Sequence, residues 1–364
     1  MRRGDLFRGS LAYLNATEIN MQDDLFGGFV PQAPLRAGAA PSTLGRHTAK
    51  VRPASGLEVW AALAGRLPEQ LRFGGSTWSY PGWDGLVWGG EYEPGILSKH
   101  GLEAYHQHPL LRTVCIDRSF WRPLTASQYA AYASQVGEGF RFVVKCPARV
   151  ADAQLRSEEG RARESNPDFL NPDMAVEQFV RPALEGLGTK LGVLVFQLSP
   201  LPWGWLSRLA LLFEKLDRLL ASVQQTLPTG TPVIVAVEVR DPELLSQALV
   251  DTLQKHGATF CLGLHGKMPP IEEQLPMLRA LWPGPLVCRW NLNRIFGAYG
   301  YADAQRKHAP FDAIRSEDPH TRAVLARTIR GIVGAGQLAY VTVSNDAEGC
   351  APLSIQKLAQ AIST

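Results

Sequence analysis

The sequence lacks the long apolar run that a membrane-spanning protein needs. None of its hydrophobic stretches approaches the roughly 18 residues that cross a bilayer. It also lacks an apolar signal core, because Arg2 and Arg3 are followed by Asp5 and mixed polar residues. Of its 364 residues, 45% are hydrophobic and 20% are charged, which is the balance of a globular protein with a large core. We therefore expect no contact with membranes.

Cysteine is scarce, and the five cysteines do not suggest a disulfide framework. They form an odd set at positions 115, 146, 261, 288 and 350, and four of them fall within predicted strands. We interpret them as small buried hydrophobic residues of a reducing, cytoplasmic protein. No Cys-x-x-Cys or His-Glu-x-x-His spacing occurs, and Gly74-Gly75 opens neither a Gly-x-Gly-x-x-Gly nor a Walker pattern. The sequence thus signals neither a metal ion nor a cofactor.

The chain also has little net charge. Its formal charge of +3 at pH 7 is too small to indicate a nucleic-acid-binding protein, although it permits a local basic patch. Composition therefore defines a globular protein and leaves its function to the pattern of strands and loops.

From residue 71 onward, strand-like and helix-like patterns alternate. Eight short runs rich in β-branched residues predict strands at 71–77, 113–120, 141–146, 192–198, 232–240, 258–264, 286–291 and 339–345. Several of these runs are almost continuously apolar, as parallel strands covered on both faces are. Eight strands that alternate with helices predict an α/β protein with a parallel (β/α)8 TIM-type barrel, because eight strands close such a barrel.

Capping residues mark several of the helices. Thr125 predicts a helix start, and so do Asp241 and Asp318, each of which is followed by a proline. Pro182 should kink or split the third helix, because a proline inside a helix removes a backbone hydrogen bond.

The segment before the barrel has no sustained periodicity. Its Pro- and Ala-rich stretch at 31–43 predicts a flexible tail over residues 1–56, ahead of a barrel domain over 57–364. Met21 is a second candidate start of translation. Beside it, Gln22, Leu25 and Phe26 resemble the Gln-Leu-Asp-Leu-Phe peptide with which bacterial proteins dock on the replication sliding clamp. A tail suits such a peptide because it reaches a partner while the domain stays folded.

Polar residues close several of the predicted strands. Because side chains alternate along a strand, residues of one parity face the barrel interior. This rule places inward Asp117 with Ser119, Lys145, Gln197, Glu238 with Arg240, Arg289 with Asn291, and Asn345. Three long strand-to-helix loops, at 78–96, 147–172 and 292–318, leave the same strand ends. In parallel barrels the active site lies at this carboxyl-terminal mouth.

The composition of the predicted mouth favours an anionic ligand. Its cations, Lys145, Arg240 and Arg289, outnumber its carboxylates, as a phosphate or carboxylate site requires. The alternative is a network of ion pairs that merely fills the barrel, since buried charges generally need partners. Trp78 follows the first strand directly, where its ring would either stack on a ligand or pack the loop. Cys115 lies deeper than the strand end, so we favour core packing for it.

Several ordered motifs carry a family resemblance. They are Gly74-Gly75-Ser76-Thr77-Trp78-Ser79-Tyr80-Pro81-Gly82-Trp83, Phe120-Trp121-Arg122, Gly139-Phe140-Arg141-Phe142 followed by Lys145-Cys146-Pro147, Phe196-Gln197-Leu198-Ser199-Pro200, Ala236-Val237-Glu238-Val239-Arg240, and Ala339 to Asn345 followed by Ala351-Pro352. Together they resemble the YecE-like family (domain of unknown function 72) from about residue 71 to 362. The resemblance implies a TIM-type barrel related in shape to sugar isomerases and the endonuclease IV group. It implies no reaction.

The chain departs from the family pattern on two strands. Relatives usually have Val-Glu-Ile-Asn on the second strand, where residues 114–117 read Val-Cys-Ile-Asp. On the seventh strand the usual Arg-Leu-His-Gly becomes Arg-Trp-Asn-Leu at 289–292. A glutamate and a histidine are thus missing from these positions, which favours a divergent or inactive member.

Three hypotheses of function follow. The first is a metal-independent enzyme acting on a small anionic ligand or a nucleic acid, with Glu238 as general acid or base and Lys145 beside it. In this hypothesis the substrate contacts are Trp78, Asp117, Gln197, Arg240, Arg289 and Asn345. The second is a DNA-associated protein that docks on the sliding clamp through its tail. The third is a catalytically inactive scaffold.

Overall fold

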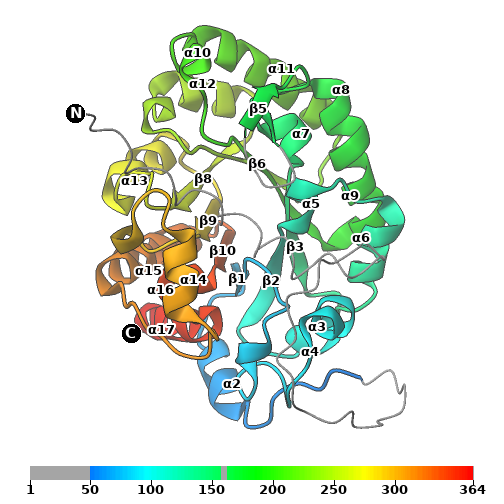
Figure 1. Ribbon diagram of the computed structural model, residues 1–364, viewed down its shortest axis with the longest axis vertical. Coiled ribbons are helices and arrows are strands. Elements are labelled where there is room, and N and C mark those ends of the chain that lie inside the picture. The colour runs from blue at the N-terminus through cyan, green and yellow to red at the C-terminus, as the bar shows by residue number, and fades with distance from the viewer. Residues whose placement is uncertain (1–49, 157–161, 364) are drawn as a thin grey trace, which may run out of the picture.

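Eight parallel strands close into a barrel that helices surround (Figure 1). The computed structural model describes residues 50–156 and 162–363. The strands are β1 (Leu71–Gly75), β2 (Leu111–Ile116), β3 (Arg141–Lys145), β6 (Leu191–Gln197), β7 (Ile234–Glu238), β8 (Thr259–Leu264), β9 (Leu286–Trp290) and β10 (Ala339–Val343). Each pairs in parallel with its neighbours, and β1 pairs with β10 to close the barrel. The predicted (β/α)8 fold and its eight strands are confirmed.

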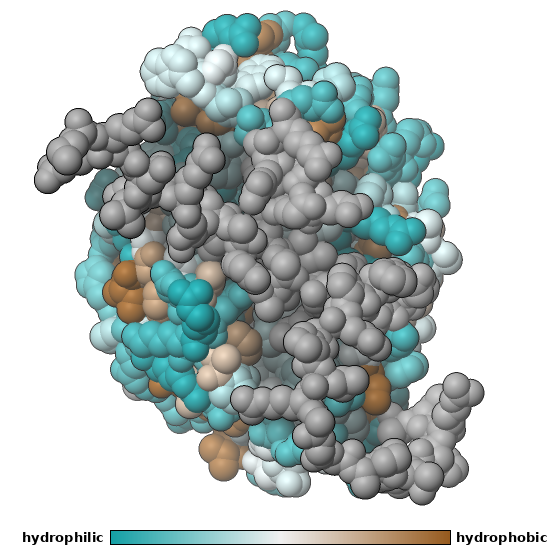
Figure 2. All heavy atoms as spheres, viewed as in Figure 1, coloured by the Kyte–Doolittle hydropathy of each residue, from teal (hydrophilic) through white to brown (hydrophobic). Residues whose placement is uncertain are grey.

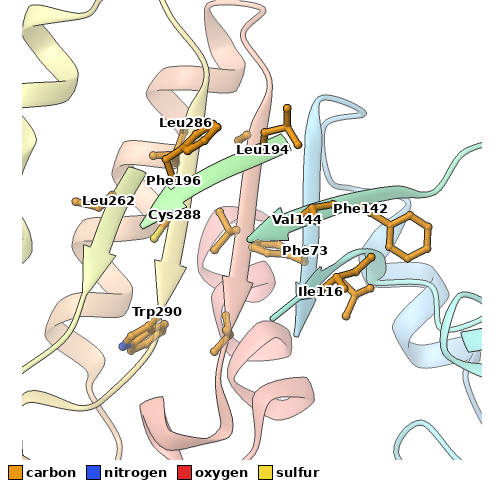
Figure 3. Close-up of a cluster of buried hydrophobic side chains, with 14 of the residues drawn as sticks. Phe73, Ile116, Phe142, Val144, Leu194, Phe196, Leu262, Leu286, Cys288 and Trp290 are labelled. Atoms are coloured by element: carbon orange, nitrogen blue, oxygen red, sulfur yellow. The ribbon is translucent and has the colours of Figure 1, made fainter. Parts of the chain in front are cut away.

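The two faces of the strands form two separate apolar layers. Inside the barrel, one small cluster contains Cys115, Val143, Val193, Val195, Ala236, Cys261, Val287 and Tyr340. The alternate residues point outward, where Phe73, Phe142, Leu194 and Trp290 belong to the large core between the barrel and the helices (Figure 3). Alternation along each strand thus separates the barrel interior from the outer core.

The helices cover the outside of the barrel, and several short ones lie within the strand-to-helix loops. Their bounds are α2 (Glu58–Ala64), α3 (Pro94–His100), α4 (Leu102–Tyr105), α5 (Arg118–Trp121), α6 (Ala126–Ala133), α7 (Ala148–Ala151), α8 (Pro172–Ala175), α9 (Arg181–Leu187), α10 (Trp203–Leu206), α11 (Leu209–Thr226), α12 (Gln247–Lys255), α13 (Ile271–Ala280), α14 (Tyr301–His308), α15 (Pro319–Gly334), α16 (Asn345–Glu348) and α17 (Ala351–Ser363). Among the described helices, none is long and apolar enough to cross a membrane.

Two of the predicted helix caps are confirmed and one is wrong. Thr125 forms a capping box with Gln128 at the start of α6, and the Asp318 carboxylate accepts the Thr321 N–H at 3.0 Å at the start of α15. Asp241 begins only a 3₁₀ turn, because its carboxylate binds the Lys267 ammonium at 2.5 Å and accepts the Leu201 N–H at 2.8 Å. The helix α12 begins later, at Gln247, behind Ser246 as its cap.

The third helical segment is divided, as Pro182 predicts. The short helix α8 is followed by a π-helical turn at Val176–Val180, and α9 begins at Arg181. Helical backbone continues without a gap from α8 through the π-helical turn into α9, and Pro182, which has no backbone N–H to donate, lies two residues past that turn.

The three long loops carry secondary structure of their own. The first contains a 3₁₀ turn at Pro81–Trp83, the second contains α7 and the antiparallel pair β4 (Gln154–Arg156) and β5 (Ala162–Ser165), and the third contains α14. Residues 50–56, which the sequence places in the tail, pair with the first loop. The Ala54 N–H donates to Val87 O at 3.0 Å, and the Gly89 N–H donates to Arg52 O at 2.8 Å.

Candidate active site at the barrel mouth

A buried carboxylate lies at the centre of the barrel mouth. Glu238 ends β7, faces the interior and has no exposed surface. Its Oε2 accepts a hydrogen bond from Arg289 Nη1 at 2.7 Å. Its Oε1 forms an ion pair with Arg240 Nη2 at 2.7 Å and accepts a hydrogen bond from Asn291 Nδ2 at 3.2 Å. Both oxygens are therefore occupied by donors from the chain itself.

Arg289 joins Glu238 to the second carboxylate of the mouth. Its Nη2 donates to Oδ1 and Oδ2 of Asp117 at 2.7 and 2.8 Å. The side-chain oxygen Oε1 of Gln197 accepts hydrogen bonds from both Arg289 Nη1 and Arg240 Nη2, each at 3.0 Å. Four parallel strands, β2, β6, β7 and β9, are thus tied together by side chains at their carboxyl-terminal ends.

The two arginines fix the charge state of Glu238. Complete burial opposes ionisation, but Arg240 and Arg289 outweigh it and lower the pKa of the Glu238 carboxyl to about 2. The pKa of each guanidinium is raised in turn, because the carboxylates outweigh burial. Glu238 is therefore a constant negative charge near neutral pH rather than a group that exchanges protons.

Lys145 is the mouth cation without a carboxylate partner in the described part of the chain. It ends β3 and is partly exposed, and its Nζ lies over the ring of Phe120 at 3.8 Å from the centroid. The Ser119 hydroxyl donates to the Lys145 carbonyl at 2.6 Å and holds α5 against β3. Burial lowers the pKa of Lys145 to about 8, with Arg289 and Arg240 adding to this effect and Asp117 and Glu238 opposing it.

The charges of the mouth do not balance. Lys145, Arg240 and Arg289 face Asp117 and Glu238, so that one positive charge is left over. The side chains of Glu238 and Arg289 are almost completely buried, whereas that of Asp117 is 30% exposed. An incoming ligand therefore meets Asp117 and Lys145 before it meets the other charged groups.

Cys115 stands where the family pattern has a glutamate. Its S–H donates to Asp117 Oδ1 at 3.1 Å from within the barrel interior. Burial, followed by the charge of Asp117, raises the pKa of the thiol well above its usual range. The residue is thus a neutral thiol that supports Asp117, and all five cysteines are buried and free.

His265 and Tyr301 both interact with Arg240 and were not among the predicted site residues. His265 follows β8, is almost fully buried, and has its ring 5.4 Å from that of Tyr301 on α14, which also interacts with Arg240. Its Nδ1 accepts the Lys267 N–H at 3.0 Å, and burial followed by Arg240 lowers its pKa to about 3. The sequence signal that could have found His265 is its position directly after the apolar strand β8, the same pattern that marks Lys145 and Glu238. A neutral histidine thus lies one strand before the position where the family pattern has one.

Trp78 lies outside the mouth, contrary to the prediction. It has no exposed surface, its Nε1 donates to Leu97 O at 3.2 Å, and its ring packs edge-on against Tyr132 at 5.2 Å. The strand β1 ends at Gly75, so the alternation that would have pointed Trp78 inward has already stopped. Its ring has no free face for a ligand.

Asn345 also has a structural position. It begins α16 and is almost completely buried. Its Oδ1 accepts from Trp83 Nε1 at 3.2 Å and from the Ala351 N–H at 2.8 Å. The side chain therefore connects the first loop to the start of α17 and makes no contact with the mouth cluster in the described structure.

The residues predicted to dock on the sliding clamp, Gln22, Leu25 and Phe26, lie outside the described residues. Within the described ranges, no group of three or more His, Cys, Asp or Glu side chains has a metal-binding arrangement. In the segments that follow β2, β6 and β9, the rings of Trp121, Trp203 and Tyr299 are exposed, with exposed fractions of 41%, 78% and 76%.

Comparison with known proteins identifies the family. The profile of the family described as "Protein of unknown function DUF72", which is also the YecE-like family, matches residues 72–364. A DUF72 family protein of Thermotoga maritima is 18% identical, with a TM-score of 0.54 over 81% of this chain and 99% of that chain. Another, from Enterococcus faecalis, is 14% identical, with a TM-score of 0.53 over 81% and 96%. No curated protein matches the chain. The match over residues 72–364 shows that this chain belongs to the DUF72 family.

Proposed function

We propose that this protein is an enzyme that binds a small substrate with a phosphate or carboxylate group at the barrel mouth. The observation that carries the proposal is the unmatched positive charge of Lys145, which is partly exposed beside a network whose other charges are paired. An anionic ligand would complete the charge balance of the mouth.

The geometry changes the roles that we assign within this proposal. Glu238 was predicted to be the general acid or base, but a pKa of about 2 and two occupied oxygens favour a role in holding Arg240 and Arg289 in place. Lys145 has a pKa of about 8, close to the range in which proton transfer near neutral pH is efficient. We therefore assign acid–base chemistry to Lys145, and we assign contact with the substrate to both Lys145 and Asp117.

An inactive scaffold is the second candidate. The observation that favours it is the mutual pairing of Glu238, Arg240 and Arg289, which stabilises the mouth without any ligand. Docking on the sliding clamp through Gln22, Leu25 and Phe26 stays a prediction from sequence.

Ligand-dependent thermal stability separates the two candidates. The probes are inorganic phosphate, citrate, sugar phosphates and the corresponding neutral sugars, tested on the wild type, Lys145→Met and Lys307→Met. Lys307 is the matched control, because its Nζ also lies over a phenylalanine ring, that of Phe296 at 5.6 Å. An anion at about 100 times its Kd should stabilise the fold by about 2.7 kcal/mol.

We expect this stabilisation in the wild type and in Lys307→Met, and we expect Lys145→Met to lose most of it. Stabilisation of equal size in Lys145→Met, or none with any anion, would favour the scaffold.

A further inference from the structure

Lys145 is placed to react with a carbonyl group. We propose that its Nζ forms an imine with the substrate, which makes the substrate an aldehyde or ketone that also bears a phosphate or carboxylate. This inference rests on the proposed function and adds to it the chemical class of the substrate and a covalent intermediate.

The first support is the contrast between Lys145 and five other lysines of the chain. Lys50, Lys190, Lys255, Lys267 and Lys357 each form an ion pair with a carboxylate. An ion-paired ammonium keeps its proton and is a poor nucleophile. Lys145 has no such partner among the described residues, although Asp117 and Glu238 belong to the same cluster, because Arg240 and Arg289 already occupy their oxygens.

The second support is the position of the amine. Lys145 projects from the end of a barrel strand, and the face of Phe120 covers one side of Nζ at 3.8 Å. A rigid strand and a fixed ring restrict the amine to a small volume at the mouth, as a covalent catalyst requires.

The third support is electrostatic. Burial, Arg289 and Arg240 disfavour the ammonium more than Asp117 and Glu238 favour it, which brings the pKa of Lys145 to about 8. About a tenth of the molecules then carry the free amine at pH 7, against fewer than one in a thousand for an ordinary lysine. Lowered lysine pKa values near other cations are typical of imine-forming lysines.

The proposed step balances without an oxidant or reductant. The nitrogen lone pair attacks the carbonyl carbon, the new C–N bond forms, and the carbonyl oxygen takes up a proton. The carbinolamine then loses this oxygen as water, which carries two of the three protons of the Lys145 ammonium, and the third proton stays on the imine nitrogen. Asp117 is the partly exposed carboxylate near Lys145 that would transfer these protons. The protonated imine keeps a positive charge next to the anionic group of the substrate.

Reductive trapping tests the imine directly. The full-length protein is incubated with pyruvate, glyoxylate, glyceraldehyde 3-phosphate or ribose 5-phosphate, with sodium cyanoborohydride as the reductant, and is analysed by intact mass and peptide mapping. We expect at least one compound to label Lys145 in the wild type and in Lys307→Met. The labelling rate should rise several-fold between pH 7 and pH 8.5.

The variant Lys145→Arg separates this inference from the proposed function. It keeps the positive charge but cannot form an imine, so it should retain anion-dependent thermal stabilisation and lose trapping. Anion binding without trapping at Lys145 in the wild type would overturn the imine and leave the anion site standing. Labelling spread over surface lysines, and equal in Lys145→Arg, would overturn the imine as well.

Discussion

The two ends of the barrel hold their arginines by different partners. At the amino-terminal end, Arg72 Nη1 donates to Gly139 O at 2.6 Å, and Arg141 Nη1 donates to Glu138 O at 2.6 Å and Phe140 O at 2.8 Å. At the carboxyl-terminal end, Arg240 and Arg289 bind the carboxylates of Glu238 and Asp117. One end pairs its guanidinium groups with backbone carbonyls, and the other pairs them with charged side chains.

This difference supports the carboxyl-terminal end of the barrel as the place of the proposed site. At the starts of the strands, the guanidinium groups donate to backbone carbonyls, and these carbonyls cannot change their charge. Ion pairs between side chains can reorganise around a ligand, and those of the mouth leave Lys145 without a partner among the described residues. Where described residues are visible on the face drawn in Figure 2, hydrophobic residues are scattered among hydrophilic ones.

Removing the central carboxylate should have the largest effect. Glu238→Gln leaves the buried guanidinium groups of Arg240 and Arg289 short of a counter-charge, so we expect it to cost about 3–5 kcal/mol in the free energy of unfolding. Urea denaturation at pH 7 measures this loss. The matched control is Glu138→Gln, whose side chain is 84% exposed and should cost less than about 1 kcal/mol. A loss below 1 kcal/mol for Glu238→Gln would contradict the network.

Glu238 should also account for most of the loss of stability at acid pH. The folded-state pKa of Glu238, about 2, lies below its ordinary value of 4.5, so its ionisation contributes about 3 kcal/mol of stability. This contribution is present above pH 4.5 and is lost as the pH falls towards 2. In Glu238→Gln the stability should therefore change less between pH 4.5 and 2 than in the wild type. Parallel curves for the two proteins would argue against a charged Glu238.

Lys145→Met should stabilise the fold near neutral pH, in contrast to Glu238→Gln. The folded-state pKa of Lys145, about 8, lies below the ordinary 10.5, so below pH 8 the fold carries a charge that it disfavours. At pH 7 we expect the variant to melt a few degrees higher than the wild type. As the pH rises from 8 to 10.5, only the unfolded state of the wild type binds a proton at Lys145. The melting temperature of the wild type should therefore rise towards that of the variant over this range. A lower melting temperature at pH 7 would mean that Lys145 has a stabilising partner.

The smallest effect should come from the other end of the barrel. Arg72→Met removes hydrogen bonding to a carbonyl near the surface, for which we expect a loss of about 1 kcal/mol. Urea denaturation compares it directly with Glu238→Gln. Equal losses at the two ends would erase the distinction between them.

Much of the mouth could be predicted because alternation is a property of the strand backbone. It placed Lys145, Gln197, Glu238 and Arg289 at the same end with no knowledge of the packing. Trp78 and Asn345 escaped the rule, because one lies three residues past β1 and the other begins a helix.

The pairing of these side chains could not be predicted. It depends on strand register and side-chain reach, which the residue pattern does not contain. That Arg289 binds two carboxylates, while Lys145 binds none among the described residues, therefore required the structure. The Asp241 cap failed for a similar reason, since Lys267 and the Leu201 N–H reach it from other parts of the fold. The role first given to Glu238 assumed an accessible carboxyl, whereas its oxygens are filled by neighbours.

The availability of Lys145 is most directly measured by its reactivity towards an amine reagent as a function of pH. Competitive labelling with trace acetic anhydride, followed by peptide mass spectrometry, reports the fraction of free amine at each lysine. Lys307 in the same digest serves as the internal reference. We predict half-maximal labelling of Lys145 near pH 8. Half-maximal labelling near pH 10.5, the ordinary value, would contradict the account.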